Sequence, residues 1–103
     1  MEKKSLSESE RLLEKKVEHY RQLTFSALQK IEVRKGISKK EKKIAVDFLQ
    51  MAKNYFSDAE HFLQKRELLT ALAAFSYAHA WLDAGVRAKI LDGKNDGRLF
   101  TLP

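Results

Sequence analysis

Apolar residues recur every three or four positions along three long stretches of the chain. That spacing places their side chains on one face of an α-helix. In the last stretch this face includes Leu68, Phe75 and Ile90, and no proline interrupts the run. The pattern predicts three helices, over about residues 7–35, 38–64 and 67–91.

Serine and glutamate residues mark the expected helix starts. Ser7 precedes Glu10 by three positions, and Ser38 precedes Glu41 in the same way. In such a capping box each side chain accepts a hydrogen bond from the other residue's backbone amide. Gly36 follows the first stretch, where a glycine commonly ends a helix.

The connections between these stretches are short, and short connections favour antiparallel neighbours. We therefore expect an all-α fold, a three-helix antiparallel up-and-down bundle that forms a single domain over residues 1–103. A short C-terminal tail, residues 92–103, follows a turn-forming segment. Residues 1–6 are expected to fray. The tail's apolar residues should dock on the bundle, because an exposed apolar tail invites association; they are Leu99, Phe100 and Leu102.

Composition limits the function classes. Cysteine is absent, which excludes disulfides and thiolate metal sites. No apolar run approaches the roughly 18 residues of a membrane span, and no apolar signal core follows the first residues. We expect a cytoplasmic protein without a cofactor. The many Lys and Glu residues are typical of a thermophile.

The formal net charge is +6, and residues 67–103 contribute none of it. Six cations and one acid, Glu41, surround the first interhelical turn. Cations at a helix N-terminus oppose the helix dipole, so a local cluster of them hints at a use. Solubilisation and binding of a phosphate backbone both remain open. The six residues are Arg34, Lys35, Lys39, Lys40, Lys42 and Lys43.

A second candidate site is polar and lies in the last helix, at His79, Asp83 and Arg87. Asp83 is placed to hold His79 by a hydrogen bond or to pair with Arg87. A histidine on an apolar face is more often a bonded core residue than a ligand. A metal shared by His61 and His79 is disfavoured, because the expected hairpin places them about 12 Å apart.

Catalytic motifs are missing. The sequence holds no Gly-x-Ser-x-Gly elbow and no phosphate-binding loop, and without cysteine a thiol nucleophile is excluded. The sequence therefore gives no reason to expect an enzyme.

Two segments resemble a known family. They are Asp58-Ala-Glu-His-Phe-Leu-Gln-Lys65 and Tyr77-Ala-His-Ala-Trp-Leu-Asp-Ala-Gly-Val-Arg87. They are similar to a small archaeal family without an assigned activity, the domain of unknown function 357. The resemblance implies a three-helix up-and-down bundle and supplies no reaction or ligand. At the turn, Arg66-Glu67 stands where the family pattern has Gly-Asp.

These observations favour a non-catalytic interaction or adaptor module, expected in an archaeal cytoplasm, with an unidentified protein partner. The alternative is backbone-directed RNA binding through the basic first turn. No membrane partner is expected, and the sequence leaves monomer and homodimer open. A small-ligand site around His79 and Asp83 is a third hypothesis.

Overall fold

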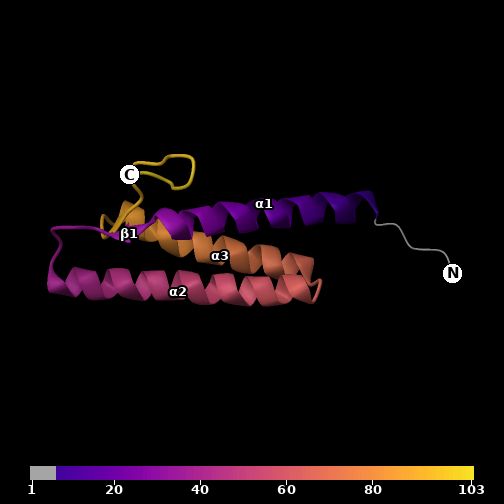
Figure 1. The fold of residues 1–103 in the computed structure, drawn as a ribbon, viewed down its shortest axis with the longest axis horizontal. Helices are drawn as coiled ribbons and strands as arrows, with labels where there is room; N and C mark the ends of the chain where they lie inside the picture. Colours follow the sequence, from indigo (N-terminus) through magenta and orange to yellow (C-terminus); the bar gives the residue numbers. More distant parts are fainter. Residues whose placement is uncertain (1–6) are drawn as a thin grey trace.

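The computed structural model describes residues 7–103, and the expectation for residues 1–6 lies outside this range. In the described chain three helices run up, down and up, joined by short connections (Figure 1). This arrangement confirms the predicted all-α, three-helix antiparallel up-and-down bundle. The elements are α1 (Glu8–Lys30), β1 (Glu32–Val33), α2 (Lys39–Gln64), α3 (Leu68–Arg87) and β2 (Leu91–Asp92).

Both expected capping boxes are present. The Glu10 backbone N–H donates to Ser7 Oγ at 3.2 Å, and the Ser7 N–H donates to the Glu10 carboxylate at 3.2 Å. At the start of α2 the corresponding distances between Glu41 and Ser38 are 3.1 and 3.0 Å. Each box satisfies two backbone donors that lack a partner inside the helix. Local sequence therefore fixes both helix starts.

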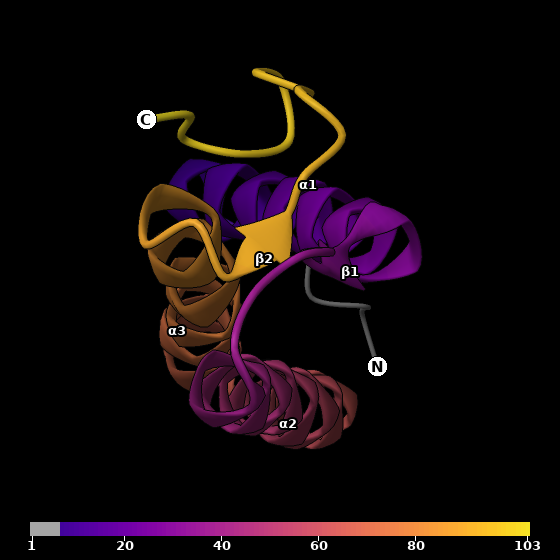
Figure 2. The same ribbon diagram turned by 90° about the vertical axis from the view of Figure 1, so that its left-hand side faces the viewer.

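α3 makes most of the contacts that hold the bundle together, because it lies between α1 and α2. Viewed down the long axis, α1 and α2 flank α3, and one side of α3 is left without a covering helix (Figure 2). α1 and α2 touch each other little. Their contacts include the rings of Phe25 and Phe56, with centroids 6.3 Å apart, and the ion pair of Arg21 with Glu60 at 3.7 Å.

Alanines line the interface between α2 and α3. Ala52 and Ala59 on α2 are fully buried, as are Ala71 and Ala78 on α3. Small side chains let two helix backbones approach closely, which explains why these two helices share the largest interface. Larger apolar side chains fill the space toward α1; Phe75 and Leu82 on α3 and Val17 on α1 are all buried.

The first helix ends at Lys30, five residues before the predicted end at residue 35. Ile31 is extended, with φ −69° and ψ 145°, and its side chain packs in the core. The next two residues pair in antiparallel register with Leu91 and Asp92. Gly36, which we expected to cap this helix, instead takes a left-handed conformation (φ 79°) in the turn before α2.

The third helix ends at Arg87, before the predicted end at residue 91. Lys89 is left-handed, with φ 63°. Its N–H donates to Val86 O at 3.1 Å, and the N–H of Ile90 donates to Gly85 O at 3.1 Å. These two bonds satisfy the last carbonyls of the helix and turn the chain toward β2. The pairing of β1 with β2 was not predicted, because it joins segments far apart in the sequence.

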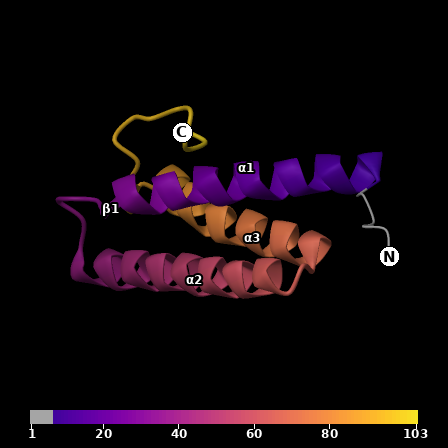
Figure 3. The same ribbon diagram turned by 45° about the vertical axis from the view of Figure 1, so that its right-hand side comes forward.

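The tail docks on the bundle, as predicted. Leu99 and Phe100 are only 6% and 3% exposed and contact the core between α1 and α3. Figure 3 shows the tail folding back beside the C-terminal ends of these two helices. Asp96 fixes the bend, because its Oδ1 accepts from the backbone N–H groups of Arg98 and Leu99 at 3.0 and 3.1 Å.

Candidate functional site

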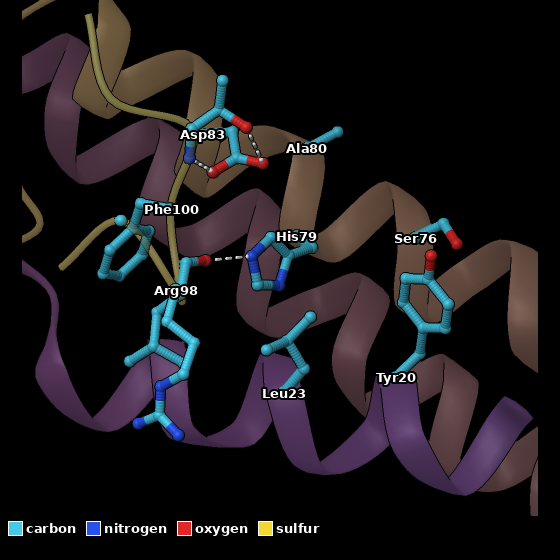
Figure 4. Close-up of a pocket in the computed structure, with 11 residues that line it drawn as sticks. Tyr20, Leu23, Ser76, His79, Ala80, Asp83, Arg98 and Phe100 are labelled. Atoms are coloured by element: carbon cyan, nitrogen blue, oxygen red, sulfur yellow. Dashed lines mark hydrogen bonds between the residues drawn. The ribbon is translucent and has the colours of Figure 1, made fainter. Parts of the chain in front are cut away.

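The polar site in the last helix forms one line along α3. His79, Asp83 and Arg87 are spaced four residues apart, so they follow one another at about one per turn. His79 and Asp83 both point from α3 toward the tail (Figure 4). The helix therefore presents a row of three polar side chains to the segment that packs against it.

His79 joins three parts of the molecule. Its Nε2 lies 2.6 Å from the backbone oxygen of Leu99, and its Nδ1 lies 3.0 Å from Thr24 Oγ1 on α1. A carbonyl oxygen only accepts, so Nε2 carries the hydrogen and donates it. In the neutral ring Nδ1 then accepts from the Thr24 hydroxyl. Both ring nitrogens of this buried histidine are occupied, which confirms a bonded core histidine.

Asp83 and Arg87 also bind the tail. The Thr101 backbone N–H donates to Asp83 Oδ1 at 2.8 Å, and Arg87 Nη1 donates to the Leu102 oxygen at 2.8 Å. The expected bond between Asp83 and His79 and the expected Asp83–Arg87 pair are both wrong. Each side chain instead meets a backbone group of the tail, which has no secondary-structure partner there. We call these three residues the tail clamp.

An open pocket of about 390 Å³ lies beside the tail clamp, between α1, α3 and the tail (Figure 4). Tyr20 and Ser76 line it from α1 and α3. His79, the one histidine among the described residues that line it, has both ring nitrogens engaged by Thr24 and the Leu99 carbonyl. The geometry therefore supports a structural role for the tail clamp, which fastens the tail to α3.

The six basic residues around the first interhelical turn form the other candidate site. All are exposed, and they extend from the chain after β1 into the first turns of α2. None of them has a carboxylate partner within 4.0 Å among the described residues, in contrast to Lys30 and Lys94, which are paired with Asp96 and Glu32 at 2.8 Å. We call them the basic turn; its members are Arg34, Lys35, Lys39, Lys40, Lys42 and Lys43.

One negative charge lies within the basic turn. The backbone and the hydroxyl of Ser38, hydrogen-bonded to Glu41, hold the pKa of that carboxyl below its usual range. Glu41 is therefore ionised at neutral pH and already occupies the start of α2. A phosphate would have to be bound mainly by the lysine and arginine side chains, with less help from the helix-start amides than the sequence pattern implies.

A third surface was missed by sequence reasoning. Six uncharged residues of α3 remain exposed between the two neighbouring helices, with Leu69 and Tyr77 71% and 60% accessible. A signal for it was present, since α3 carries no charged side chain outside the row of His79, Asp83 and Arg87, which indicates a helix that is covered on most sides or binds a partner. We call this surface the α3 face; it consists of Leu69, Ala73, Ser76, Tyr77, Ala80 and Ala84.

The α3 face is shaped by one aromatic side chain. The Tyr77 ring stacks on that of Tyr55 from α2, with centroids 5.4 Å apart and planes at 28°. An open hollow of about 400 Å³, lined by Ala73, Ser76 and Ala80, borders Tyr77. A second hollow, of about 360 Å³, lies between the two tyrosines and Ala84. The surface thus carries a projecting ring beside shallow depressions lined by small side chains.

Two kinds of feature are absent from residues 7–103. No group of three or more His, Cys, Asp or Glu side chains lies close enough together to hold a metal ion. None of the described helices combines the length and the apolar character needed to cross a bilayer.

Comparison with known proteins identifies one relationship. A family model described as "Protein of unknown function (DUF357)" matches residues 19–91, most of the chain. The matched range includes the basic turn, the tail clamp and the α3 face. No curated protein and no solved structure matches the chain.

Proposed function

The chain belongs to the DUF357 family, and we propose that it is a non-catalytic interaction module that binds a helical partner on the α3 face. The observation that carries the proposal is the run of uncharged, exposed side chains from Leu69 to Ala84. A third of all residues in the chain are charged, yet none on this face is.

The length of the α3 face supports the proposal. Fifteen residue steps at about 1.5 Å each extend over about 22 Å, or four helical turns. Single exposed apolar residues need no explanation, whereas a contiguous apolar surface marks an interaction site. Tyr77 supplies an aromatic anchor of the kind that dominates binding energy, and the alanines around it let another helix approach closely.

The partner's chemistry follows from the face. A charged helix would bury its charges against side chains that cannot pair with them, at a cost of several kcal/mol for each ion. A helix with small, uncharged residues along one side would instead fit the hollows around Tyr77. We therefore expect an uncharged helical surface as the ligand.

A displayed library of helical peptides with uncharged faces tests this function. The wild-type chain should enrich peptides with small residues on one side. Ala80→Glu places a charge in the middle of the α3 face and should bind none of them. Val46→Glu is the matched control, since Val46 is 57% exposed on α2, away from this face. Enrichment that Ala80→Glu leaves unchanged would overturn the proposal.

A second candidate function is backbone-directed nucleic-acid binding through the basic turn. Its support is that, among the described residues, six exposed cations without carboxylate partners gather at one end of the bundle. Such binding would depend on phosphate charge and not on base identity, because no aromatic side chain interleaves the cluster. The first turns of α2 would then lie along the nucleic-acid backbone.

Anisotropy of labelled RNA and DNA tests this second function. A variant with Lys39, Lys40, Lys42 and Lys43 changed to Glu should lose the interaction. The matched control changes four exposed lysines elsewhere to Glu and should keep most of it. Absence of wild-type binding at low salt would exclude this function. The control positions are Lys15, Lys16, Lys53 and Lys65.

A further inference from the structure

The partner on the α3 face is, we infer, a second copy of this chain, packed so that the two α3 helices run antiparallel across a two-fold axis. This inference rests on the proposed function and specifies the partner that binds to the α3 face. It follows from three features of the α3 face: the order of large and small side chains along it, the position of Tyr77, and the distribution of charge around it.

The order of side chains is self-complementary. We place the axis between Ser76 and Tyr77. Each residue of the face then meets the residue of the second copy that lies equally many positions on the other side of this point. Leu69 then lies opposite Ala84 of the second copy, and Tyr77 lies opposite its Ser76. Ala73 lies opposite Ala80. Each large residue meets a small one, the arrangement that lets two helices interdigitate at a short distance.

A parallel pairing lacks this complementarity. It would place Leu69 against Leu69 and Tyr77 against Tyr77, so that large side chains collide while alanines face alanines across a gap. An interface between identical copies is isologous when a two-fold axis relates them, and a two-fold axis perpendicular to α3 makes the helices antiparallel. A two-fold axis parallel to α3 would relate the copies equally well, so it is side-chain size that selects the antiparallel arrangement.

Tyr77 and the hollow beside it fit each other across the axis. The ring projects from the α3 face at 60% exposure and is held by its stack on Tyr55. The adjoining hollow of about 400 Å³ is lined by Ala73, Ser76 and Ala80 of the same face. In the two-fold dimer each Tyr77 lies over Ser76 of the other copy, and its ring enters the hollow of that copy.

The antiparallel orientation keeps the two basic turns apart. Each copy carries a formal charge of +6, so two copies repel unless their positive regions are kept apart. The basic turn lies at the end of the bundle where α3 ends, since Arg34 N–H donates to Ile90 O at 2.9 Å. An antiparallel pair places the two basic turns at opposite ends, at least about 30 Å apart, well beyond the ~8 Å screening length at physiological salt.

Sedimentation equilibrium from low to high micromolar concentration is the first test. The wild-type chain should form a dimer of twice 11.9 kDa. Tyr77→Ala should weaken the dimer about tenfold or more, as expected for a central aromatic anchor. Ala80→Glu should be monomeric with unchanged helical circular dichroism, and Val46→Glu should dimerise like the wild type.

Cysteine cross-linking tests the register, since the chain has no cysteine of its own. An Ala73→Cys chain mixed with an Ala80→Cys chain should form the mixed disulfide readily. Ala73→Cys alone should cross-link slowly, because the axis separates the two copies of residue 73 by about 10 Å along the helix, beyond the ~7 Å limit for a disulfide. Faster cross-linking of Ala73→Cys with itself would overturn the antiparallel register.

The two proposals fail in different ways. A wild-type chain that stays monomeric at high micromolar concentration yet selects peptides dependent on Ala80 would overturn self-association and leave the interaction module standing. A monomer that selects no peptide would overturn both. A dimer that Ala80→Glu does not disrupt would place the interface on another surface and overturn the inference.

Discussion

At the scale of single residues, two helix ends depend on non-glycine residues in the left-handed conformation. Arg66 and Lys89 have φ of 62° and 63°, and each closes its helix with a pair of hydrogen bonds to the last carbonyls. For a residue with a Cβ this conformation costs about 1–2 kcal/mol. The hydrogen bonds that close the helix offset this cost. Arg66 therefore keeps the left-handed conformation at a position where the family pattern has glycine.

Lys89→Gly should therefore stabilise the chain by about 1 kcal/mol, because glycine adopts φ 63° without strain. Lys89 makes no ion pair with another residue of the described chain, so the change removes none. Urea unfolding of the wild type and the variant measures the difference. Ala88→Gly is the control: Ala88 has φ −76° and ψ −4°, so glycine there should destabilise by about 0.5–1 kcal/mol. Equal effects of the two changes would contradict the conformational explanation.

At the scale of elements, Gly85 sets the distance between α3 and β2. A Cβ at this position would lie 2.2 Å from Leu91 Cδ1 and 2.6 Å from its Cγ. Leu91 is 1% exposed, so its side chain has little room to move aside. The glycine in an otherwise alanine-rich helix thus permits β2 to return against α3 and pair with β1.

Gly85→Ala should destabilise the chain by about 1–2 kcal/mol, although alanine is the better helix former, because overpacking a filled core outweighs the gain in helix propensity. Thermal unfolding followed by circular dichroism measures the loss. In the double variant with Leu91→Ala, adding Gly85→Ala should cost less than it does in the wild type, since the clashing atoms are gone. Additive effects of the two changes would argue against the contact.

A charged contact connects the tail bend to α1. Lys30 Nζ donates to Asp96 Oδ2 at 2.8 Å. This bond, with the N–H groups of Leu99 and Arg98, holds the pKa of Asp96 below its ordinary value of 3.8, despite the opposing effect of partial burial. A carboxyl with a depressed folded-state pKa stabilises the fold above its unfolded pKa, and this stabilisation is lost as the pH falls through the folded pKa.

Asp96→Asn should accordingly lower the melting temperature at pH 7, and this difference should shrink as the pH falls below 3.8, because the wild-type carboxyl then takes up its proton. Melting curves of both proteins across this range provide the measurement. Asp47→Asn is a suitable control, since Asp47 is exposed on α2 and has no ion-pair partner among the described residues. A pH-independent difference for Asp96→Asn would show that its charge does not matter.

Sequence alone predicts an element well where the interactions that determine it join residues close together in the sequence. The three helices follow from side-chain spacing. The starts of α1 and α2 follow from capping pairs such as Ser38 and Glu41. The helix ends at Lys30 and Arg87 do not, because they depend on Glu32 pairing with Asp92, a partner remote in sequence.

The same distinction applies to the sites. His79, Asp83 and Arg87 are recognisable as one polar line, but their partners are mostly backbone atoms of the tail, which carry no side-chain signal. For the α3 face, the scarcity of charged residues on this helix, which has only Asp83 and Arg87, was visible in the sequence. Which side of α3 stays uncovered depends on how α1 and α2 pack around it.

At the scale of the whole molecule, the two candidate interfaces differ in charge. The basic turn gathers six cations at one end of the bundle, none of them paired with a carboxylate of residues 7–103, while the α3 face is neutral along its length. Partners on these two surfaces would not compete for the same residues. An antiparallel dimer would present a basic turn at each of its two ends.

Salt dependence separates the two surfaces. If all six cations of the basic turn contact phosphates, nucleic-acid affinity should fall about a thousandfold between about 50 and about 200 mM salt, because each neutralised phosphate releases a counterion. The dimer constant should change less than about threefold over this range, since no charge lies on the α3 face and the basic turns are more than a screening length apart. Fluorescence anisotropy measures the nucleic-acid affinity, and sedimentation equilibrium on the same preparation measures the dimer constant. A dimer constant that changes as steeply as nucleic-acid binding would mean that charged residues form the interface, and the α3 face would then be the wrong surface.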